Sequence, residues 1–313
     1  MVNTNKKKRI GQLGDRLFQL ALLIWPLLQF TVFYIIVNAN SFLLAFQGKV
    51  QEGFSLEHFA YIFSLGGYKD AAVFSSIMKA VGTSFSFYLI TTLISVPLAL
   101  LFAYYIFKKG FGGKAFRLFL FLPSIVSSMV MVTLFMEFLD SDARKLLVLL
   151  GIPVGDEPLF NPLSTASYPA VIFFYLWTNF GTTTLIYSNK MGEIAPETVE
   201  AAQLDGANAW QELIYVVLPF TFPTLSVFLV TGFATIFANQ YNLFSFYGSA
   251  MPTGEAGTVG YYIFNQVQGP AAMQNFNASA FNQMAALSLV VTAVVVPLTL
   301  TLRKLLDKYG PQD

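Results

Sequence analysis

Long apolar stretches alternate with short polar segments over most of the chain. The charge-free stretches each have room for the roughly 20 apolar residues that a membrane-spanning helix needs. We therefore expect six transmembrane helices, near residues 17–38, 82–107, 117–138, 167–189, 215–239 and 281–302. The stretch from Asn239 to Ala280 is rich in Gly, Asn, Gln and Pro, which is typical of a loop rather than of a seventh helix. The pattern predicts an all-α membrane protein.

The expected helices divide the chain into four parts. Residues 1–16 form a basic tail, and residues 17–81 contain the first helix and an outer segment. Residues 82–302 form a core of five transmembrane helices with a polar loop at 190–215, and residues 303–313 form a second tail. The first apolar run is too long for a signal-peptide core and lacks a small-residue cleavage site, so we interpret it as a helix.

The charged residues are few and unevenly placed. They make up 11% of the chain, whereas about a quarter of an average soluble domain is charged. With the N-terminus inside, thirteen of the 18 Lys and Arg residues fall on the inner side and five on the outer side. Because cytoplasmic loops carry an excess of Lys and Arg, we expect both termini and the loop 190–215 in the cytoplasm. The net charge of +1 lacks the basic excess that is typical of a nucleic-acid-binding protein.

Most enzyme and metal sites need residues that this chain lacks. It has no cysteine and one histidine, His58, for which a structural role is expected because a metal site needs several ligands. It has no Gly-rich phosphate loop of the P-loop kind, so ATP cannot bind by that route. We therefore expect a transport subunit rather than an enzyme, with no cofactor or metal of its own.

The loop 190–215 is short and acidic, and it lies between two apolar stretches. Its acids are Glu193, Glu197, Glu200, Asp205 and Glu212. These charges are too costly inside a bilayer, so the loop must lie in water. Pro196 suits the first position of a helix and Gly206 suits the left-handed residue that ends one, so we expect two short helices broken at the glycine. An apolar stripe follows at helical spacing: Trp210, Leu213, Ile214 and Val217. Such a hairpin is a docking element, although an ordinary solvated pair of surface helices has the same composition.

The chain resembles a known family at this loop. The residues Glu200-Ala201-Ala202, then Gly206 and Val216, then Leu218-Pro219, resemble the cytoplasmic loop of permease subunits of binding-protein-dependent ABC importers. Val216 departs from the pattern conservatively, because isoleucine is commoner there. Two further runs, Phe121-Leu122-Pro123 and Ala285-Ala286-Leu287-Ser288, resemble the carbohydrate branch, the maltose and glycerol-phosphate type.

The resemblance implies a type I ABC importer permease fold with a cytoplasmic coupling helix. It also implies a heterodimer with a second, related permease, two cytoplasmic ATPase subunits that hold ATP and Mg, and an external solute-binding protein. The location would be a bacterial or archaeal cytoplasmic membrane. The residues that the resemblance assigns to ATPase coupling are Glu200, Ala201, Ala202, Asp205, Gly206, Leu218 and Pro219.

Neutral polar side chains recur at helical spacing within the expected spans. Apart from Arg117, the first residue of its span, the only charged residue inside a span is Glu137, near an end, which argues against a proton-driven carrier. Hydroxyls, amides and aromatic rings suit a neutral sugar, which needs hydrogen bonds and an apolar face to stack on. The candidate substrate pathway is Ser124, Ser128, Tyr175, Thr178, Asn179, Thr182, Thr235 and Asn239. The alternative for each of them is hydrogen bonding between helices.

The resemblance implies a permease subunit of an ATP-driven importer that moves a carbohydrate, an oligosaccharide, by alternating access. Three alternatives remain open. One is a secondary, ion-coupled carrier, although no inverted repeat or broken helix is visible in the sequence. The second is an ABC importer permease for a solute such as a glycerol phosphodiester. The third is a channel-like or scaffold membrane protein, which has no need for the hairpin.

Overall fold

The structure is a computed structural model, and it describes residues 15, 18–48, 53–63, 71–152, 159–160, 167–249, 257–269 and 278–311. Within these residues the regular elements are helices, with one isolated bridge between Gln47 and Phe54. The expected all-α membrane protein is confirmed. The chain divides into two compact units, the first containing Met1–Tyr68 and Asn277–Val290 and the second containing Lys69–Phe276 and Val291–Asp313.

The first unit is built around a long apolar helix, Phe18–Leu44, which includes the π-helix η1 (Phe30–Ile36) and α2 (Val37–Leu44). In the most apolar stretch of this helix no residue is buried within the chain. The surface of the helix is therefore available to lipid or to another protein. The first expected span is present, and its helix continues beyond the expected end at residue 38.

His58 holds the connection after α2 in place. It lies on α3 (Glu57–Ile62) and is buried, and its Nε2 atom is 2.9 Å from the carbonyl oxygen of Gln47. The Nδ2 atom of Asn282 donates a hydrogen bond to the same oxygen at 3.2 Å. Asn282 belongs to α15 (Ala278–Tyr309), whose first part completes this unit. These contacts are those of a structural histidine.

The second unit begins with α4 (Ala71–Phe107), a helix of 37 residues. At 1.5 Å per residue it is about 55 Å long, which exceeds the roughly 30 Å of apolar bilayer. The expected start at residue 82 was wrong, because the helix begins at Ala71. A charged residue such as Lys79 ends the apolar part of a helix without ending the helix itself.

The third expected span, 117–138, is not one helix. α5 (Gly113–Ile125) is followed by a helix that starts at Ser128, and the directions of the two differ by 105°. Val126, between them, has an extended backbone with φ −79° and ψ 144°. The expectation of one helix was wrong because the stretch keeps a high hydropathy across Pro123 and Ser127, and hydropathy does not report the direction of the backbone. The second helix comprises α6 (Ser128–Phe138), the π-helix η2 (Leu139–Ala143) and α7 (Arg144–Leu149).

The count of six spans is met only in part. In the described part of the chain four helices are long and apolar enough to cross a bilayer, and the bent pair makes a fifth. The fifth and sixth expected spans are α11 (Leu218–Ala234) and α15. The fourth expected span, α8 (Tyr168–Met191), has 24 residues but is not among the apolar helices, because its Tyr, Thr and Asn residues lower its hydropathy. Six spans result only if the bent pair and α8 are both counted.

The stretch from Asn239 to Ala280 contains two short helices, α12 (Leu243–Tyr247) and α13 (Val259–Gln268). The Thr258 hydroxyl accepts a hydrogen bond from the Tyr261 amide at 3.2 Å and thereby caps α13. The Val259 amide donates to the Ser84 hydroxyl of α4 at 2.9 Å. The described part of this stretch is therefore a partly helical loop attached to α4.

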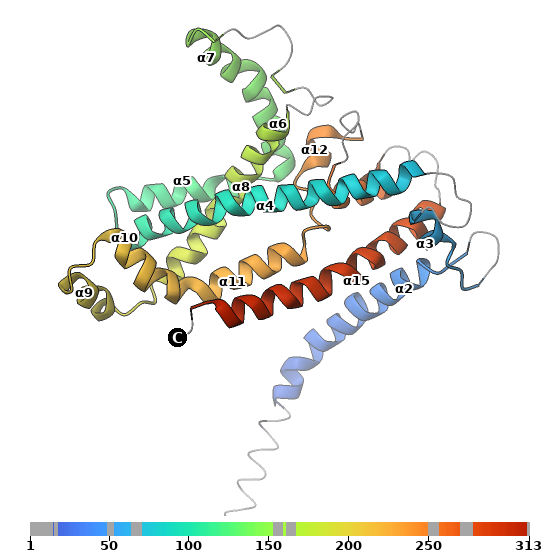
Figure 1. The fold of residues 1–313 in the computed structure, drawn as a ribbon, viewed down its shortest axis with the longest axis horizontal. Helices are drawn as coiled ribbons and strands as arrows, with labels where there is room; N and C mark the ends of the chain where they lie inside the picture. The colour runs from blue at the N-terminus through green and yellow to red at the C-terminus, as the bar shows by residue number, and fades with distance from the viewer. Residues whose placement is uncertain are drawn as a thin grey trace, which may run out of the picture. The chain divides into compact units, whose positions relative to one another are not determined.

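α8 is the central helix of the second unit, because it packs against α4, α5 and α11 (Figure 1). Two apolar clusters surround it. The first cluster includes Phe87, Met131, Phe135, Phe174, Tyr241 and Phe246. The second cluster includes Ala99, Ala103, Tyr187, Met191, Leu213 and Val217. Since Leu213 lies at the end of the polar loop and Val217 directly after it, the second cluster attaches that loop to α4 and α8.

Candidate functional site

Two features of the second unit are candidates for function: a helical hairpin in the loop 190–215 and a polar cavity among α4, α8 and α11. The hairpin consists of α9 (Pro196–Leu204), α10 (Ala209–Glu212) and the π-helix η4 (Leu213–Val217). α9 begins at Pro196, as expected for a proline at the first helical position.

The break between α9 and α10 is at Gly206, as predicted. This glycine has a φ of +85°, in the left-handed region. The amide of Ala207 donates to the carbonyl of Ala202 at 3.0 Å, and the amide of Gly206 donates to the carbonyl of Gln203 at 3.1 Å. This pair of hydrogen bonds is the usual glycine-terminated end of a helix. The chain direction after α9 is therefore set by the backbone.

A capping box starts α10. The Asn208 side chain accepts hydrogen bonds from the amides of Trp210 and Gln211, both at 3.0 Å. In return the Gln211 side chain accepts from the Asn208 amide at 2.8 Å. A helix of four residues gains little from its own backbone, so this reciprocal cap is what starts it at Ala209.

The hairpin presents acidic and apolar side chains together. Glu200, Ala201, Asp205 and Gly206 are exposed and Ala202 is partly buried. Leu204, between them, is 88% exposed. Large apolar residues on a water-facing loop mark an interaction surface when they cluster. We call Glu200, Ala201, Ala202, Asp205 and Gly206, together with Leu204, the docking face.

The other predicted coupling residues and the apolar stripe lie differently. Leu218 and Pro219 are partly buried. They begin α11, which follows the hairpin in the chain, and they are not part of the docking face. Half of the stripe, Leu213 and Val217, is buried in the core. Trp210 is 63% exposed and Ile214 is 49% exposed, so these two extend the apolar surface of the hairpin.

Glu212 is the exception among the acids of the loop. Four of the five acids are exposed, as expected, but Glu212 is 2% exposed. Its Oε1 atom accepts from the Tyr104 hydroxyl and from Lys108 Nζ, both at 3.0 Å. Its Oε2 atom accepts from Lys108 Nζ at 3.1 Å and from Gln203 Nε2 at 2.9 Å. The expectation that the whole loop lies in water was wrong here, because a basic residue at the end of α4 offers this carboxylate a partner.

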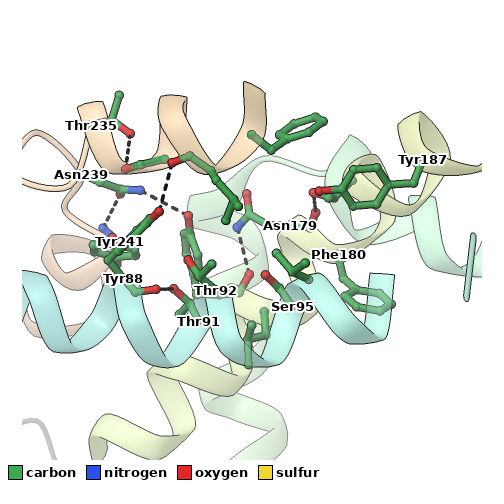
Figure 2. Close-up of a pocket in the computed structure, with 17 residues that line it drawn as sticks. Tyr88, Thr91, Thr92, Ser95, Asn179, Phe180, Tyr187, Thr235, Asn239 and Tyr241 are labelled. Atoms are coloured by element: carbon green, nitrogen blue, oxygen red, sulfur yellow. Dashed lines mark hydrogen bonds between the residues drawn. The ribbon is translucent and has the colours of Figure 1, made fainter. Parts of the chain in front are cut away.

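The cavity has a volume of about 190 Å³. Figure 2 shows side chains from α4, α8 and α11 and from the residues just after α11 converging on it. Its polar lining consists of Tyr88, Thr91, Thr92, Ser95, Tyr175, Asn179, Thr183, Tyr187, Thr235, Asn239 and Tyr241. The apolar lining consists of Val96, Leu176, Phe180, Phe228, Leu229 and Gly232. No charged side chain is among the described residues that line it.

Half of the predicted pathway residues line this cavity: Tyr175, Asn179, Thr235 and Asn239. Asn239 Nδ2 donates to the Tyr175 hydroxyl at 3.2 Å, and Asn179 Nδ2 donates to the Tyr175 carbonyl at 2.9 Å. The Thr235 hydroxyl donates to the Thr231 carbonyl at 3.0 Å. The structure thus joins α8 to the end of α11 through Tyr175 and Asn239.

The other four predicted pathway residues are not part of the cavity lining. The Ser124 and Thr178 hydroxyls donate to carbonyls of their own helices, those of Phe121 at 2.7 Å and Phe174 at 3.0 Å. Ser128 and Thr182 are exposed. Ser124 and Ser128 do not share a helix face, because the break at Val126 separates them.

Sequence reasoning missed the contribution of α4. Tyr88, Thr91, Thr92 and Ser95 follow one another at intervals of three and four residues and therefore lie on one face of the helix. This spacing in the sequence indicates a polar face on the helix and could have predicted its part in the lining. The Tyr88 hydroxyl donates to the Leu229 carbonyl of α11 at 3.0 Å, so α4 also closes the cavity against α11.

Tyr187 has an unusual environment. Its side chain is fully buried and lines the cavity, and its hydroxyl has no hydrogen-bond partner among the described residues. A buried hydroxyl without a partner is unfavourable, and a polar ligand in the cavity would remove that cost. The lining as a whole offers hydroxyls, amides and aromatic faces to a neutral ligand.

The family described as binding-protein-dependent transport system inner membrane component matches residues 95–309. The multiple sugar-binding transport system permease protein MsmF of Streptococcus mutans is 23% identical over 285 residues, which cover 90% of this chain and 93% of that protein. The maltose/maltodextrin transport system permease protein MalF of Escherichia coli K12 is 23% identical over 154 residues, 49% of this chain and 30% of that protein.

The fold also matches a solved structure. A chain of a bacterial alginate ABC transporter, in complex with an alginate pentasaccharide-bound periplasmic protein, superposes with a TM-score of 0.72 at 19% identity. The match covers 94% of this chain and 96% of that one. The predicted importer permease fold is confirmed.

Proposed function

Because the chain belongs to the family of binding-protein-dependent transport system inner membrane components, we propose that it is the permease subunit of an ATP-driven importer for a neutral oligosaccharide. The observation that carries the proposal is the uncharged cavity among α4, α8 and α11, lined by tyrosine, threonine, serine and asparagine side chains. Hydroxyl and amide groups hydrogen-bond sugar hydroxyls, and aromatic rings stack on the apolar faces of sugars.

The cavity supports a neutral substrate over a charged one. An anionic sugar or a phosphodiester is normally bound by Arg or Lys, and the described lining has neither. A secondary carrier needs a side chain such as Asp, Glu or His on its pathway to couple transport to protons, and the described lining has none of these. The names of the relatives, which include multiple-sugar and maltose permeases, agree with a carbohydrate.

The size of the cavity supports a second permease as partner. Binding sites for small molecules usually measure about 300–1,000 Å³, whereas this cavity measures about 190 Å³. One chain therefore supplies part of a pathway, and a related permease would supply the rest. We propose an external solute-binding protein as the third partner, in keeping with the family description.

The docking face would connect the chain to one of two ATPase subunits, which hold the ATP and Mg. Glu200 and Asp205 offer charge-assisted hydrogen bonds to basic residues of an ATPase, and the 88% exposed Leu204 offers an apolar anchor between them. Leu218 and Pro219 would set the angle at which α11 leaves the hairpin. Closure of the ATPases on ATP would move the hairpins and convert the permease pair from inward-facing to outward-facing. ATP drives this change only through its different affinity for the two states.

The experiment is uptake by the reconstituted transporter in proteoliposomes with ATP inside. Radiolabelled maltotriose and raffinose serve as neutral probes, and an alginate trisaccharide serves as the acidic probe. We expect ATP-dependent uptake of at least one neutral probe and none of the acidic one. Uptake that follows an ion gradient without ATP, or uptake of the acidic probe alone, would overturn the proposal.

A further inference from the structure

Glu212 joins the docking hairpin to the helix that lines the cavity. We infer that this buried carboxylate is a positioning residue that transmits movement of the hairpin to α4 and so couples ATP hydrolysis to opening of the cavity. The inference rests on the proposed function and adds to it the element that carries the movement.

The contacts of Glu212 come from both sides of the joint. Gln203, on α9, donates to Oε2 at 2.9 Å, while Tyr104, in the last turn of α4, donates to Oε1 at 3.0 Å. Lys108, directly after α4, contacts both oxygens, at 3.0 and 3.1 Å. Tyr104 and Lys108 are four residues apart and therefore lie on the same face of that helix end. A single carboxylate thus holds α9 and α4 at the same time.

Burial makes this joint stiff. Glu212 is 2% exposed, whereas the Lys108 side chain is 36% exposed, so the carboxylate side of the joint is the one shielded from water. A buried charge that loses a partner is strongly destabilised, whereas an exposed ion pair contributes little. A shift of α9 relative to α4 therefore either breaks a hydrogen bond to this buried carboxylate or carries α4 along. The apolar neighbours Leu213 and Val217, both buried in the cluster that contains Ala103 of α4, support the same joint.

α4 connects the joint directly to the cavity. Ser95 lines the cavity and lies nine residues before Tyr104, which is about 14 Å along the helix axis. α4 is one helix throughout this interval, including Pro97. Tyr88, Thr91 and Thr92 continue the lining on the preceding turns. A displacement of the end of α4 therefore reaches the cavity wall without passing through a loop.

The test uses the complete transporter: this chain with its partner permease, ATPases and binding protein in proteoliposomes. Ser95→Cys introduces a reporter, because the chain has no cysteine of its own. A membrane-impermeant maleimide applied from the ATPase side measures access to the reporter, with and without ATP and vanadate. The rate of ATP hydrolysis is measured on the same preparation. Neither readout requires knowledge of the transported sugar.

In the otherwise native chain we expect ATP and vanadate to change the labelling of the reporter by about fivefold or more. Glu212→Gln and Lys108→Met should keep ATP hydrolysis but lose this change in labelling. The exchange Glu212→Lys with Lys108→Glu should restore it, since the ion pair is re-formed. The matched control is Glu193→Gln, which breaks the exposed 2.7 Å pair with Lys190 in the same loop and should leave both readouts as in the native chain.

A full labelling response in both Glu212→Gln and Lys108→Met would overturn the inference. If those variants do not assemble, Tyr104→Phe is the alternative test of the inference, because it removes one hydroxyl contact to Glu212 and leaves the ion pair with Lys108 intact. It should assemble and reduce the response, and an unchanged response would also overturn the inference. If the native chain itself gives no response to ATP and vanadate, the proposed function fails instead, since the reporter then does not follow the ATPase cycle.

Discussion

Gly181 of α8 lies directly against the backbone of Leu120 in α5. A Cβ atom placed on Gly181 would be 2.0 Å from the Leu120 carbonyl oxygen and 2.9 Å from the Cα atom of Phe121. Small residues at helix crossings let membrane helices approach to backbone contact. This glycine therefore sets the distance between α5 and α8, the helix that carries Tyr175 and Asn179 into the cavity.

Replacing Gly181 should separate these two helices. We expect Gly181→Val to lower stability by about 1–3 kcal/mol or more, because the contacted atoms are backbone and cannot move aside. The measurement is the thermal unfolding midpoint of the purified chain in detergent. Gly82→Ala is the control, since Gly82 is also helical but nothing lies within 4 Å of its Cβ position. Equal midpoints for the two variants would contradict the close approach.

Gly206 should tolerate only residues that accept a left-handed backbone. At its φ of +85° an ordinary side chain costs about 1–2 kcal/mol, whereas asparagine is accepted more readily. We expect Gly206→Val to insert into the membrane normally but to lose ATPase co-purification, and Gly206→Asn to retain most of it. Comparable co-purification of the two variants would show that ATPase binding does not depend on the left-handed backbone at Gly206.

Reversal of a single charge should distinguish the docking face from the rest of the hairpin. Glu200→Lys is expected to abolish ATPase binding and uptake while membrane insertion is unchanged. Glu197→Lys reverses the same charge three residues earlier on α9 and serves as the comparison. The measurement is co-purification of the ATPase with the tagged permease. If both variants lose it to the same degree, the effect is one of overall charge and not of Glu200.

Two tyrosines of the cavity should respond oppositely to loss of the hydroxyl. Tyr187→Phe removes a buried hydroxyl without a partner among the described residues, so we expect the unfolding midpoint to stay equal or to rise. Tyr175→Phe leaves Asn239 Nδ2 without its acceptor, so we expect a loss of about 1 kcal/mol. Both variants should raise the KM of uptake, because both remove a group from the sugar pathway. A lower midpoint for Tyr187→Phe would show that its hydroxyl has a structural partner.

The orientation of the hairpin is testable in the same chain. Asp205→Cys places a thiol on the exposed docking face of a protein without native cysteine. An impermeant maleimide should label it in inverted membrane vesicles and not in intact cells. Labelling in intact cells would place the hairpin outside and would end the proposal of ATPase coupling.

The sequence alone determined the features that depend on local chemistry. Pro196 and Gly206 predicted the two ends of α9, because each acts through its own backbone angles. The apolar stretches predicted a helical membrane protein, because the bilayer requires such lengths. The helical spacing of polar residues predicted four residues of the cavity lining, Tyr175, Asn179, Thr235 and Asn239, which are half of the predicted pathway residues.

Only the tertiary structure decided which polar groups are buried and which helices meet. The bend at Val126 lies in a stretch of high hydropathy, and the neighbouring Pro123 and Ser127 do not specify its direction. The local sequence does not distinguish Glu212 from the exposed acids of the loop. It is buried because Lys108, 104 residues earlier, forms an ion pair with it. α4 lines the cavity because Tyr88 meets Leu229 of α11, 141 residues later. These outcomes depend on contacts between segments that are distant in the sequence. A local sequence pattern does not show which distant segments will meet or how favourable their contact is.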